Sequence, residues 1–374
     1  MSMLAERGNR VLYVDPMVSP AAKLRCSPFF SHVSLRCRLH NITRTLRVLT
    51  APFGVPLSRY PSFCWLNQAI LFRCIKYWQE RLRFVNPILW VYEPRAALFV
   101  DRLPRKVLVY DCVDEHKAYP GVNKNYIERL EQELLRASDV VFVTAEGLLE
   151  SKKQHNPNVF FLPNGVDTEI FRRALKEETE VARETEALPR PILGFVGSIH
   201  SWMDFDLLFR VATANSEASI VLVGPIGRDV SPAQIRKTRT IKNIHLLGYK
   251  KAELIPHYVK SFDVCLNLFK SIELTRSVNP IKIYEYLAAG KPTVSVDMPE
   301  IRRLAEVIYI AHSPSEFLAK VQTALHEGDN GKRKRRIQKA NEYSWSVLLE
   351  KAWRCVEIAL RNENAELKLG PRVK

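Results

Sequence analysis

Short apolar runs alternate with segments of helical periodicity along most of the chain. In the first half, Val, Leu, Phe and Tyr gather in runs of four or five residues, at 10–14, 88–92, 107–110, 140–144 and 159–162. The segments 63–84 and 125–137 carry apolar residues at a helical spacing. Such alternation is typical of parallel strands joined by crossover helices. The sequence therefore predicts an α/β protein.

The same pattern restarts after a turn-rich and charged seam. The seam begins with Pro163-Asn164-Gly165-Val166-Asp167, which is strong turn chemistry. Strands are then predicted at 192–196, 219–223, 243–247, 262–268 and 292–296, with helices at 199–209, 251–260 and 281–289. We expect two doubly wound domains: residues 1–170, a linker at 171–190, residues 191–342, and a terminal helix and tail at 343–374 that pack back toward the first domain. Doubly wound sheets bind ligands at the carboxyl ends of their strands, so the site is expected in the cleft between the domains.

Composition narrows the protein class. Of 374 residues, 47% are hydrophobic and 26% are charged, which is typical of a globular protein. No apolar run is long enough to span a membrane, and the first residues do not read as a secretion signal. The seven cysteines are scattered and form no Cys-x-x-Cys pair. We therefore expect reduced thiols, no metal site and a cytoplasmic location.

The net charge of +16 is concentrated at the two ends of the chain. Residues 1–100 hold 14 Lys and Arg against 4 Asp and Glu. A basic surface attracts nucleic acid, anionic lipid or phosphorylated substrates, and charge alone does not choose among them. A helix-turn-helix signal, a zinc-finger spacing and an interleaved basic and aromatic motif are all missing from the sequence, which disfavours nucleic acid.

Three motifs occur in a characteristic order: Pro163–Phe171, Gly194–Ser198 and Ser277–Pro292. Together they resemble bacterial glycosyltransferases of the GT-B fold, the family 4-like enzymes of capsule, exopolysaccharide and teichuronic-acid assembly. The resemblance extends from about residue 4 to residue 360, and the third motif is its most specific part. It implies two Rossmann-like domains facing a cleft, with the acceptor on the first domain and a nucleotide-sugar donor, UDP- or GDP-linked, on the second.

Two departures from the family pattern leave an alternative open. The residues at the start of the chain look like the end of the family's first helix, so the first strand of the N-terminal domain has no counterpart here. Family members also carry two glutamates eight positions apart, whereas Ser277 stands eight positions before Glu285. The alternative is a truncated, inactive relic that acts as a binding partner.

The third motif contains the strongest candidate for a phosphate site. Asn279 is a good N-cap and Pro280 a good first helical residue, which would place Lys282 in the first turn, with Arg276 just before the helix. A helix N-terminus beside a cation attracts phosphate and would stabilise a leaving diphosphate without a metal. The resemblance implies Lys282 at the diphosphate and Glu285 at the ribose hydroxyls. An ordinary capped surface helix is the alternative.

Other donor contacts are expected after two strands. Gly197 and Ser198 end the second motif, where glycine would let phosphate approach backbone N–H groups. Tyr249 follows Gly248 and could stack on the nucleotide base. Turn residues and a surface tyrosine are the alternatives. His200 and Trp202 are interpreted as loop or packing residues. No cofactor is expected besides the nucleotide-sugar substrate.

The acceptor hydroxyl needs a base, and the first domain offers carboxylates. Asp114 follows a predicted strand and is the first candidate, with Asp111 and His116 behind it. A turn or helix-capping role is the alternative. Segment 63–84 mixes aromatic and basic residues; packing on the sheet is favoured, and contact with anionic lipid is the alternative. The same two options apply to the basic run at 332–336. The expected location is therefore cytoplasmic, with peripheral contact at the inner membrane face as an addition.

Overall fold

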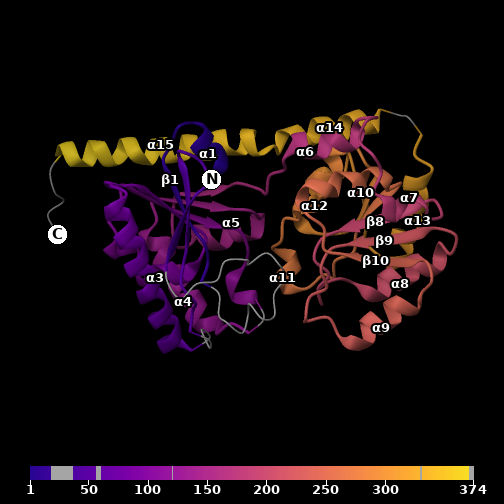
Figure 1. Cartoon of the computed structure of the whole chain (residues 1–374), viewed down its shortest axis with the longest axis horizontal. Helices are drawn as coiled ribbons and strands as arrows, with labels where there is room; N and C mark the ends of the chain where they lie inside the picture. Colours follow the sequence, from indigo (N-terminus) through magenta and orange to yellow (C-terminus); the bar gives the residue numbers. More distant parts are fainter. Residues whose placement is uncertain (18–36, 56–59, 120, 329–330, 370–374) are drawn as a thin grey trace. The chain divides into compact units, whose positions relative to one another are not determined.

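The computed structural model describes residues 1–17, 37–55, 60–119, 121–328 and 331–369, and these form two compact units. Unit 1 comprises Met1–Val143, Leu148–Phe161 and the chain from Ala352, and unit 2 comprises Thr144–Gly147 and Leu162–Lys351 (Figure 1). Residues 162–170, assigned above to the first domain, are part of unit 2.

Unit 1 contains two sheets. In the first, β3 (Leu46–Thr50) pairs in parallel with β1 (Val11–Val14) and antiparallel with β2 (Arg38–Asn41). The second is parallel, in the order β4 (Ile88–Val91), β5 (Val107–Cys112), β6 (Val140–Val143) and β7 (Val159–Phe161). All residues of β5 and β6 are buried, which explains their continuous apolar sequence. The helices are α1 (Ser2–Glu6), α3 (Pro61–Arg81), α4 (Lys124–Ala137), α5 (Glu146–Lys153), which begins in unit 2, and α15 (Trp345–Leu369), which also begins there.

Unit 2 is built on one six-stranded parallel sheet in the order β10-β9-β8-β11-β12-β13. The strands are β8 (Ile192–Val196), β9 (Ser219–Val223), β10 (Ile244–Gly248), β11 (Val264–Asn267), β12 (Thr293–Val296) and β13 (Tyr309–Ala311). The α-helices are α6 (Thr168–Arg172), α7 (Arg183–Glu186), α8 (Phe205–Ala214), α9 (Pro232–Thr240), α10 (Ile255–Ser261), α11 (Glu273–Arg276), α12 (Ile281–Ala288), α13 (Pro314–Leu325) and α14 (Lys332–Glu342). Two apolar clusters, built on α10 with α12 and on α8 with α13, pack against the strands.

The strand order of unit 2 contains a topological switch point. Counted from β8, the order is 3-2-1-4-5-6, which is the Rossmann order. The chain leaves β8 toward β9 and β10, then returns to place β11 on the other side of β8. At such a point the loops after the two central strands diverge and leave a crevice at their carboxyl ends. The topology therefore predicts a ligand site after β8 and β11.

All ten predicted strands are confirmed to within two residues at either end. Three sequence-based expectations are wrong. The helix predicted at 199–209 starts only at Phe205, because the Asp204 side chain accepts a hydrogen bond from Leu207 N and caps it there. The N-cap of α12 is Pro280, without a side-chain bond, and Asn279 precedes it. Cys37 and Cys74 form a disulfide, so not all thiols are reduced.

Candidate functional site at the carboxyl edge of the unit 2 sheet

Three glycines line the carboxyl edge of the unit 2 sheet. Gly197 and Gly224 follow β8 and β9, and Gly248 ends β10. Gly197 N donates to Val223 O at 2.9 Å, and Gly224 N donates to Gly248 O, also at 2.9 Å. A side chain at Gly224 would place its Cβ 1.9 Å from the carbonyl oxygen of Gly197, and φ there is 153°. Glycine is therefore required at position 224, because the backbone of Gly197 and Ser198 packs directly against it.

The loops after β8, β9 and β11 are bonded together beyond the ends of these strands. Ile199 N donates to Pro225 O at 2.9 Å, and Gly227 N donates to Ile199 O at 2.7 Å. On the other side, Lys270 N donates to Trp202 O at 2.8 Å. Residues 197–204 are therefore held at the switch point by the loop after β9 on one side and by the loop after β11 on the other. His200 and Trp202 lie in this loop, which confirms their interpretation as loop residues, and the helix begins only at Phe205.

His200 and Asp229 form a side-chain pair within this loop cluster. His200 Nδ1 lies 2.7 Å from Asp229 Oδ1, and the imidazole stacks on the Trp202 ring with centroids 4.0 Å apart and planes at 13°. Ser201 N and Oγ both donate to Asp229 Oδ2, at 2.9 and 2.6 Å. Burial raises the pKa of Asp229, but the bonds from Ser201 and His200 outweigh it and lower that pKa to about 2. Asp229 is therefore a firmly ionised anchor.

Helix α12 is fixed beneath the same edge. Val196 N, at the end of β8, donates to the Tyr286 hydroxyl at 2.8 Å. One turn earlier, Lys282 Nζ lies 3.0 and 2.8 Å from the two Glu285 carboxylate oxygens. The Lys282 side chain is 33% exposed and that of Glu285 only 9%. Burial raises the pKa of Glu285, and Lys282 opposes this shift.

The segment before α12 joins two of the sequence motifs. Asn164 Nδ2 donates to Asn279 O at 2.7 Å, so the 163–171 and 277–292 motifs meet at the start of α12. Asn279 itself is buried, and neither of its side-chain polar atoms has a hydrogen bond of normal geometry. Asn279 therefore supports the backbone turn from inside unit 2, and Lys282 is the group that reaches solvent.

The remaining donor candidates lie at the same edge by topology. Arg276 is exposed at the end of α11, which follows β11, and Tyr249 is 37% exposed directly after β10. All six candidate donor residues thus follow carboxyl ends of strands in one parallel sheet: Gly197, Ser198, Tyr249, Arg276, Lys282 and Glu285. Sequence reasoning missed Gly224, Asp229 and Lys270; the signal for Gly224 was its place directly after an apolar run.

The candidate base residues lie in unit 1, at the end of β5. Asp111 is 9% exposed and accepts a hydrogen bond from Trp90 Nε1 at 2.9 Å. Burial raises the pKa of Asp111 to about 6 against the opposing effect of Trp90. Asp114 accepts a bond from the Tyr119 hydroxyl, and burial raises its pKa while Tyr119 opposes. Both carboxyls therefore hold a proton more readily than an exposed aspartate.

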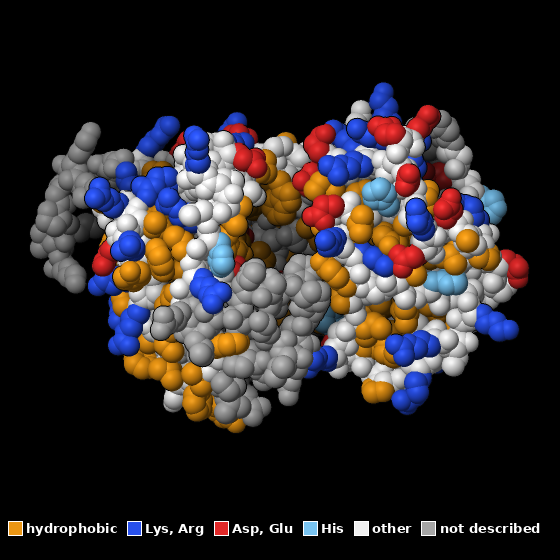
Figure 2. Space-filling model, viewed as in Figure 1, with side chains coloured by type: hydrophobic (Ala, Val, Ile, Leu, Met, Phe, Trp, Pro, Cys, Tyr) orange, Lys and Arg blue, Asp and Glu red, His pale blue; other side chains and the backbone are white. Residues whose placement is uncertain are grey.

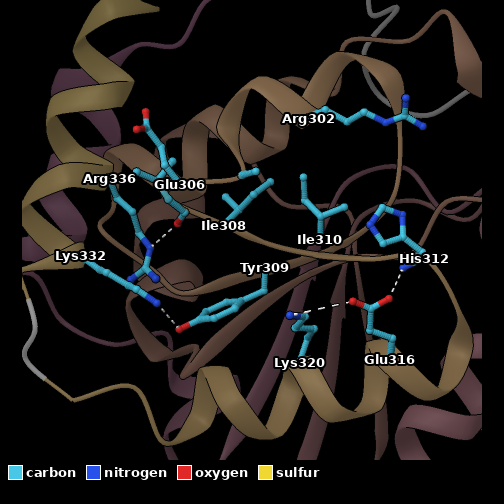
Figure 3. Close-up of a pocket in the computed structure, with 12 residues that line it drawn as sticks. Arg302, Glu306, Ile308, Tyr309, Ile310, His312, Glu316, Lys320, Lys332 and Arg336 are labelled. Carbon is cyan, nitrogen blue, oxygen red and sulfur yellow. Dashed lines mark hydrogen bonds and ion pairs between the residues drawn. The ribbon is translucent and has the colours of Figure 1, made fainter.

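Two cavities lie elsewhere in the described residues. One, of about 410 Å³, is in unit 1 and is lined in part by Tyr13 and Tyr92. The other, of about 400 Å³, lies along the edge strand β13 of unit 2 (Figure 3). Its cations already have partners: Lys320 pairs with Glu316, and Arg336 pairs with Glu327 outside the cavity lining. It is also two strands away from β11, so it is not the donor site.

No described helix is long and apolar enough to cross a membrane, and the described residues hold no group of three or more His, Cys, Asp or Glu side chains arranged to bind a metal ion.

Comparison with known proteins matches the domain that carries this edge. Residues 190–327 match the family model "Glycosyl transferases group 1". The chain is 21% identical over 280 residues to a putative teichuronic acid biosynthesis glycosyltransferase, TuaH of Bacillus subtilis, covering 70% of this chain and 69% of that protein. The matched domain contains every strand of the six-stranded sheet.

Solved structures agree on the fold. A UDP-forming trehalose-phosphate synthase from Burkholderia xenovorans superposes with a TM-score of 0.69 at 12% identity, covering 95% of this chain and 99% of that one. Sucrose-phosphate synthase from Thermosynechococcus elongatus gives 0.68 at 14%, covering 95% and 91%. Anabaena HepE in complex with UDP gives 0.61 at 13%, covering 83% and 86%. Residues 190–327 thus form a glycosyl transferases group 1 domain, and the chain as a whole has the fold of the GT-B glycosyltransferases.

Proposed function

We propose that this enzyme moves a sugar from a nucleotide-diphosphate donor to a hydroxyl of a glycan or lipid-linked acceptor during surface-polysaccharide synthesis. The observation that carries the proposal is the edge described above: bare glycine backbone after β8 and β9, beside Lys282 in the first turn of α12, all within the matched domain. The similarity to the TuaH protein supports the polysaccharide role. HepE and an Escherichia coli trehalose-6-phosphate enzyme were solved with UDP or a UDP sugar, so UDP is the first nucleotide to test.

The donor would be held by groups of complementary charge. Phosphate oxygens suit the N–H groups near Gly197 and the Lys282 ammonium, since a helix N-terminus and a cation both attract anions. Lys282 would then exchange its bond to Glu285 for the diphosphate, and Glu285 would accept bonds from the ribose hydroxyls. Tyr249 would lie on the base. Negative charge that develops on the leaving diphosphate would be met by Lys282 and Arg276, so we propose that no metal is needed.

Lys282→Ala should weaken UDP binding and lower turnover together, by about 10- to 100-fold, because a charge-assisted hydrogen bond contributes about 1.5–3 kcal/mol. Calorimetric titration with UDP and GDP, with and without EDTA, measures binding and the metal question at once. Lys320→Ala, which removes a similarly paired lysine far from this edge, is the matched control. Absence of any binding by the wild-type chain up to millimolar nucleotide would refute the donor site.

Unit 1 would bind the acceptor and supply the base. We assign the base to Asp114, with Asp111 as the competing residue, because both are carboxyls at the end of β5 with raised pKa values. The cavity lined by Tyr13 and Tyr92 is the proposed acceptor subsite, since each ring is 39% exposed and aromatic faces suit sugar rings.

An inactive relic would still bind UDP but would transfer no sugar, so a transfer assay with labelled UDP-sugar separates the two functions.

Helix α3 supports peripheral contact with a membrane. Its buried side mixes apolar Cys64 and Phe72 with two polar side chains. Asn67 Nδ2 donates to Val55 O, and Gln79 Nε2 donates to Pro104 O at 2.8 Å. Its outer side exposes Trp65 by 56% and Tyr77 by 55%, with basic residues between them. Figure 2 shows hydrophobic and basic side chains mixed on the visible surface of unit 1. The helix thus packs through a mixed face and also leaves aromatic and basic side chains exposed on its outer side. We therefore propose that the enzyme makes peripheral contact with the cytoplasmic face of the membrane.

The paired substitution Arg73→Glu and Lys76→Glu should reduce binding to phosphatidylglycerol vesicles more than tenfold, because each basic residue near an anionic surface contributes about 1 kcal/mol. Co-sedimentation with phosphatidylglycerol and with phosphatidylcholine vesicles is the measurement. Arg236→Glu with Arg239→Glu makes the same charge change at exposed positions of α9 and is the control. Equal vesicle binding by wild type and the α3 variant would contradict the contact.

A further inference from the structure

Strands β1 and β4 of unit 1 are each paired on one side only. β1 ends the three-stranded sheet, where it bonds to β3, and β4 ends the other sheet, where it bonds to β5. Val11 N donates to Thr45 O, in the direction of β3. Because main-chain groups alternate in direction along a strand, those of Leu12 and Val14 point away from β3. Within the described residues, no strand lies bonded on that side of β1.

β4 presents the same kind of edge. Lys106 N donates to Pro87 O, in the direction of β5, so the main-chain groups of Ile88 and Trp90 point away from β5. In the part of the chain that the structure describes, β4 has no second partner strand.

Both edges have the composition of central strands. β1 reads Val-Leu-Tyr-Val and β4 reads Ile-Leu-Trp-Val, without the charges or proline that protect natural sheet edges. Continuous apolar runs are typical of parallel strands that are buried on both faces. Here, however, all four residues of β4 are only half-buried, and no residue of β1 is fully buried. The apolar surface of both strands therefore lacks part of its cover.

The two edges are neighbours that run in the same direction. At the amino ends, Arg10 directly precedes β1, and its guanidinium lies 4.8 Å from the centre of the Phe84 ring and donates to Leu82 O, just before β4. At the carboxyl ends, Tyr13 and Tyr92 line one cavity. The contact at the amino ends is made by a long side chain rather than by main chain. The edges therefore lie further apart than two bonded strands.

Unit 2 shows what such a pair of edges accommodates. Its sheet has β8 in the middle, bonded to β9 on one side and to β11 on the other. Without β8, this sheet would split into β9 with β10, and β11 with β12 and β13. In unit 1, β1 with β3 corresponds to the first group, and β4 with β5 and β6 corresponds to the second. The position between β1 and β4 is therefore that of a central strand.

We propose that unit 1 binds an extended, apolar segment of a partner polypeptide as a parallel strand between β1 and β4. Leu12 and Val14 would bond to one side of this strand. Ile88 and Trp90 would bond to its other side. Main-chain hydrogen bonds would supply the affinity, and the apolar edges would favour β-branched or aromatic side chains in the partner. The inference does not depend on the proposed function, and the added strand would end beside the unit 1 cavity.

A peptide with the sequence of Ile192–Val196, flanked by lysines for solubility, is the probe, because β8 fills the corresponding position in unit 2. Saturating peptide should raise the melting midpoint of the full chain by several degrees, since it binds the folded state. Hydrogen exchange followed by mass spectrometry should slow in the fragments that contain residues 11–14 and 88–91. The fragment with residues 244–248, from the edge strand β10, should not change.

Two controls test whether main-chain bonds hold the peptide. The same peptide N-methylated at alternate residues keeps its side chains but loses its donors to one edge, so it should bind about tenfold more weakly or worse. Leu12→Pro removes an N–H that points away from β3 and leaves the bonds to β3, a change that an edge strand tolerates. This variant should melt close to wild type and should also lose about tenfold in peptide affinity.

Three results would overturn the inference. Exchange at residues 11–14 and 88–91 that is as slow in the free chain as in β5 would show that the position is already occupied. Equal affinity for the methylated and unmethylated peptides would show apolar adhesion in place of strand pairing. Unchanged exchange at both edges in millimolar peptide would show that no strand binds there. Each of these results leaves the donor site in unit 2 untouched, because titration with UDP tests that site separately.

Discussion

Asp114→Asn should abolish sugar transfer while UDP binding stays at the wild-type level. A positioned base contributes about 10²- to 10⁴-fold to rate, and an amide cannot take the acceptor proton. The amide can still accept the Tyr119 hydroxyl bond, so the turn after β5 should persist. Initial rates with labelled UDP-sugar and calorimetry with UDP are the two measurements. Normal transfer by this variant would show that the base lies elsewhere.

Asp111→Asn is the matched control. It should stabilise the folded chain, whereas most substitutions of a buried residue destabilise it. Burial raises the pKa of Asp111 from 3.8 to about 6, so the folded chain binds a proton that the unfolded chain has released. Stability therefore falls as pH rises from about 4 to 6, and the cost persists above that range. A shift of this size corresponds to about 3 kcal/mol near pH 7. Asn removes the charge and can still accept from Trp90, so it should raise the midpoint of urea unfolding.

The two variants together assign the base. If Asp114 is the base, Asp111→Asn should be more stable than wild type and should retain transfer. Loss of transfer in Asp111→Asn with normal transfer in Asp114→Asn would move the assignment to Asp111. In that case the enzyme would keep a costly buried carboxyl for its chemistry rather than for its fold.

The unit 2 fold was largely predictable because its strands are buried on both faces. Continuous runs such as Ser219–Val223 are apolar at nearly every position, and sequence pattern alone predicts them within a residue or two. The three missed strands are different. β2 (Arg38–Asn41) and β13 (Tyr309–Ala311) are edge strands, short and only partly buried, and β3 (Leu46–Thr50) lies in a strongly basic stretch. β2 and β3 pair with each other across a short connection, whereas the parallel partner of β3 is β1 (Val11–Val14), much earlier in the sequence.

The candidate site was predictable where one motif carries it. The 277–292 motif placed Lys282 in the first turn of α12, although the turn starts one residue later than Asn279 would have set it. The place of Asp229 in the site was not predictable. Its carboxylate contacts His200, 29 residues earlier, in a loop that the sequence predicted as helix. The apolar residues of 199–209 fit helical spacing, but Ile199 and Met203 are instead buried by bridges to the loops after β9 and β11.

A buried charge network in unit 1 carries the largest expected effect on stability. Lys152, only 4% exposed, lies 2.7 Å from a Glu131 oxygen and 3.1 Å from a Glu115 oxygen. Glu131 is 3% exposed and also accepts the Tyr110 hydroxyl at 2.7 Å. Burial lowers the pKa of Lys152, but Glu131 and the other acidic neighbours outweigh it and raise the pKa to about 12. The ammonium thus compensates the buried carboxylate of Glu131 and also pairs with Glu115.

Lys152→Met should destabilise the chain by about 3–5 kcal/mol, because it leaves a buried glutamate without its counter-charge. Lys153→Met, at the exposed neighbouring position of α5, should change stability by less than about 0.5 kcal/mol. Adding Glu131→Gln to Lys152→Met should recover part of the loss, since the uncompensated charge is then removed. Urea unfolding followed by circular dichroism measures all three.

Because the folded pKa of Lys152 lies above its unfolded value, its contribution to stability should be complete below about pH 10 and should disappear as the pH rises toward 12. An equal loss in the Lys152 and Lys153 variants would show that the network contributes nothing beyond surface charge.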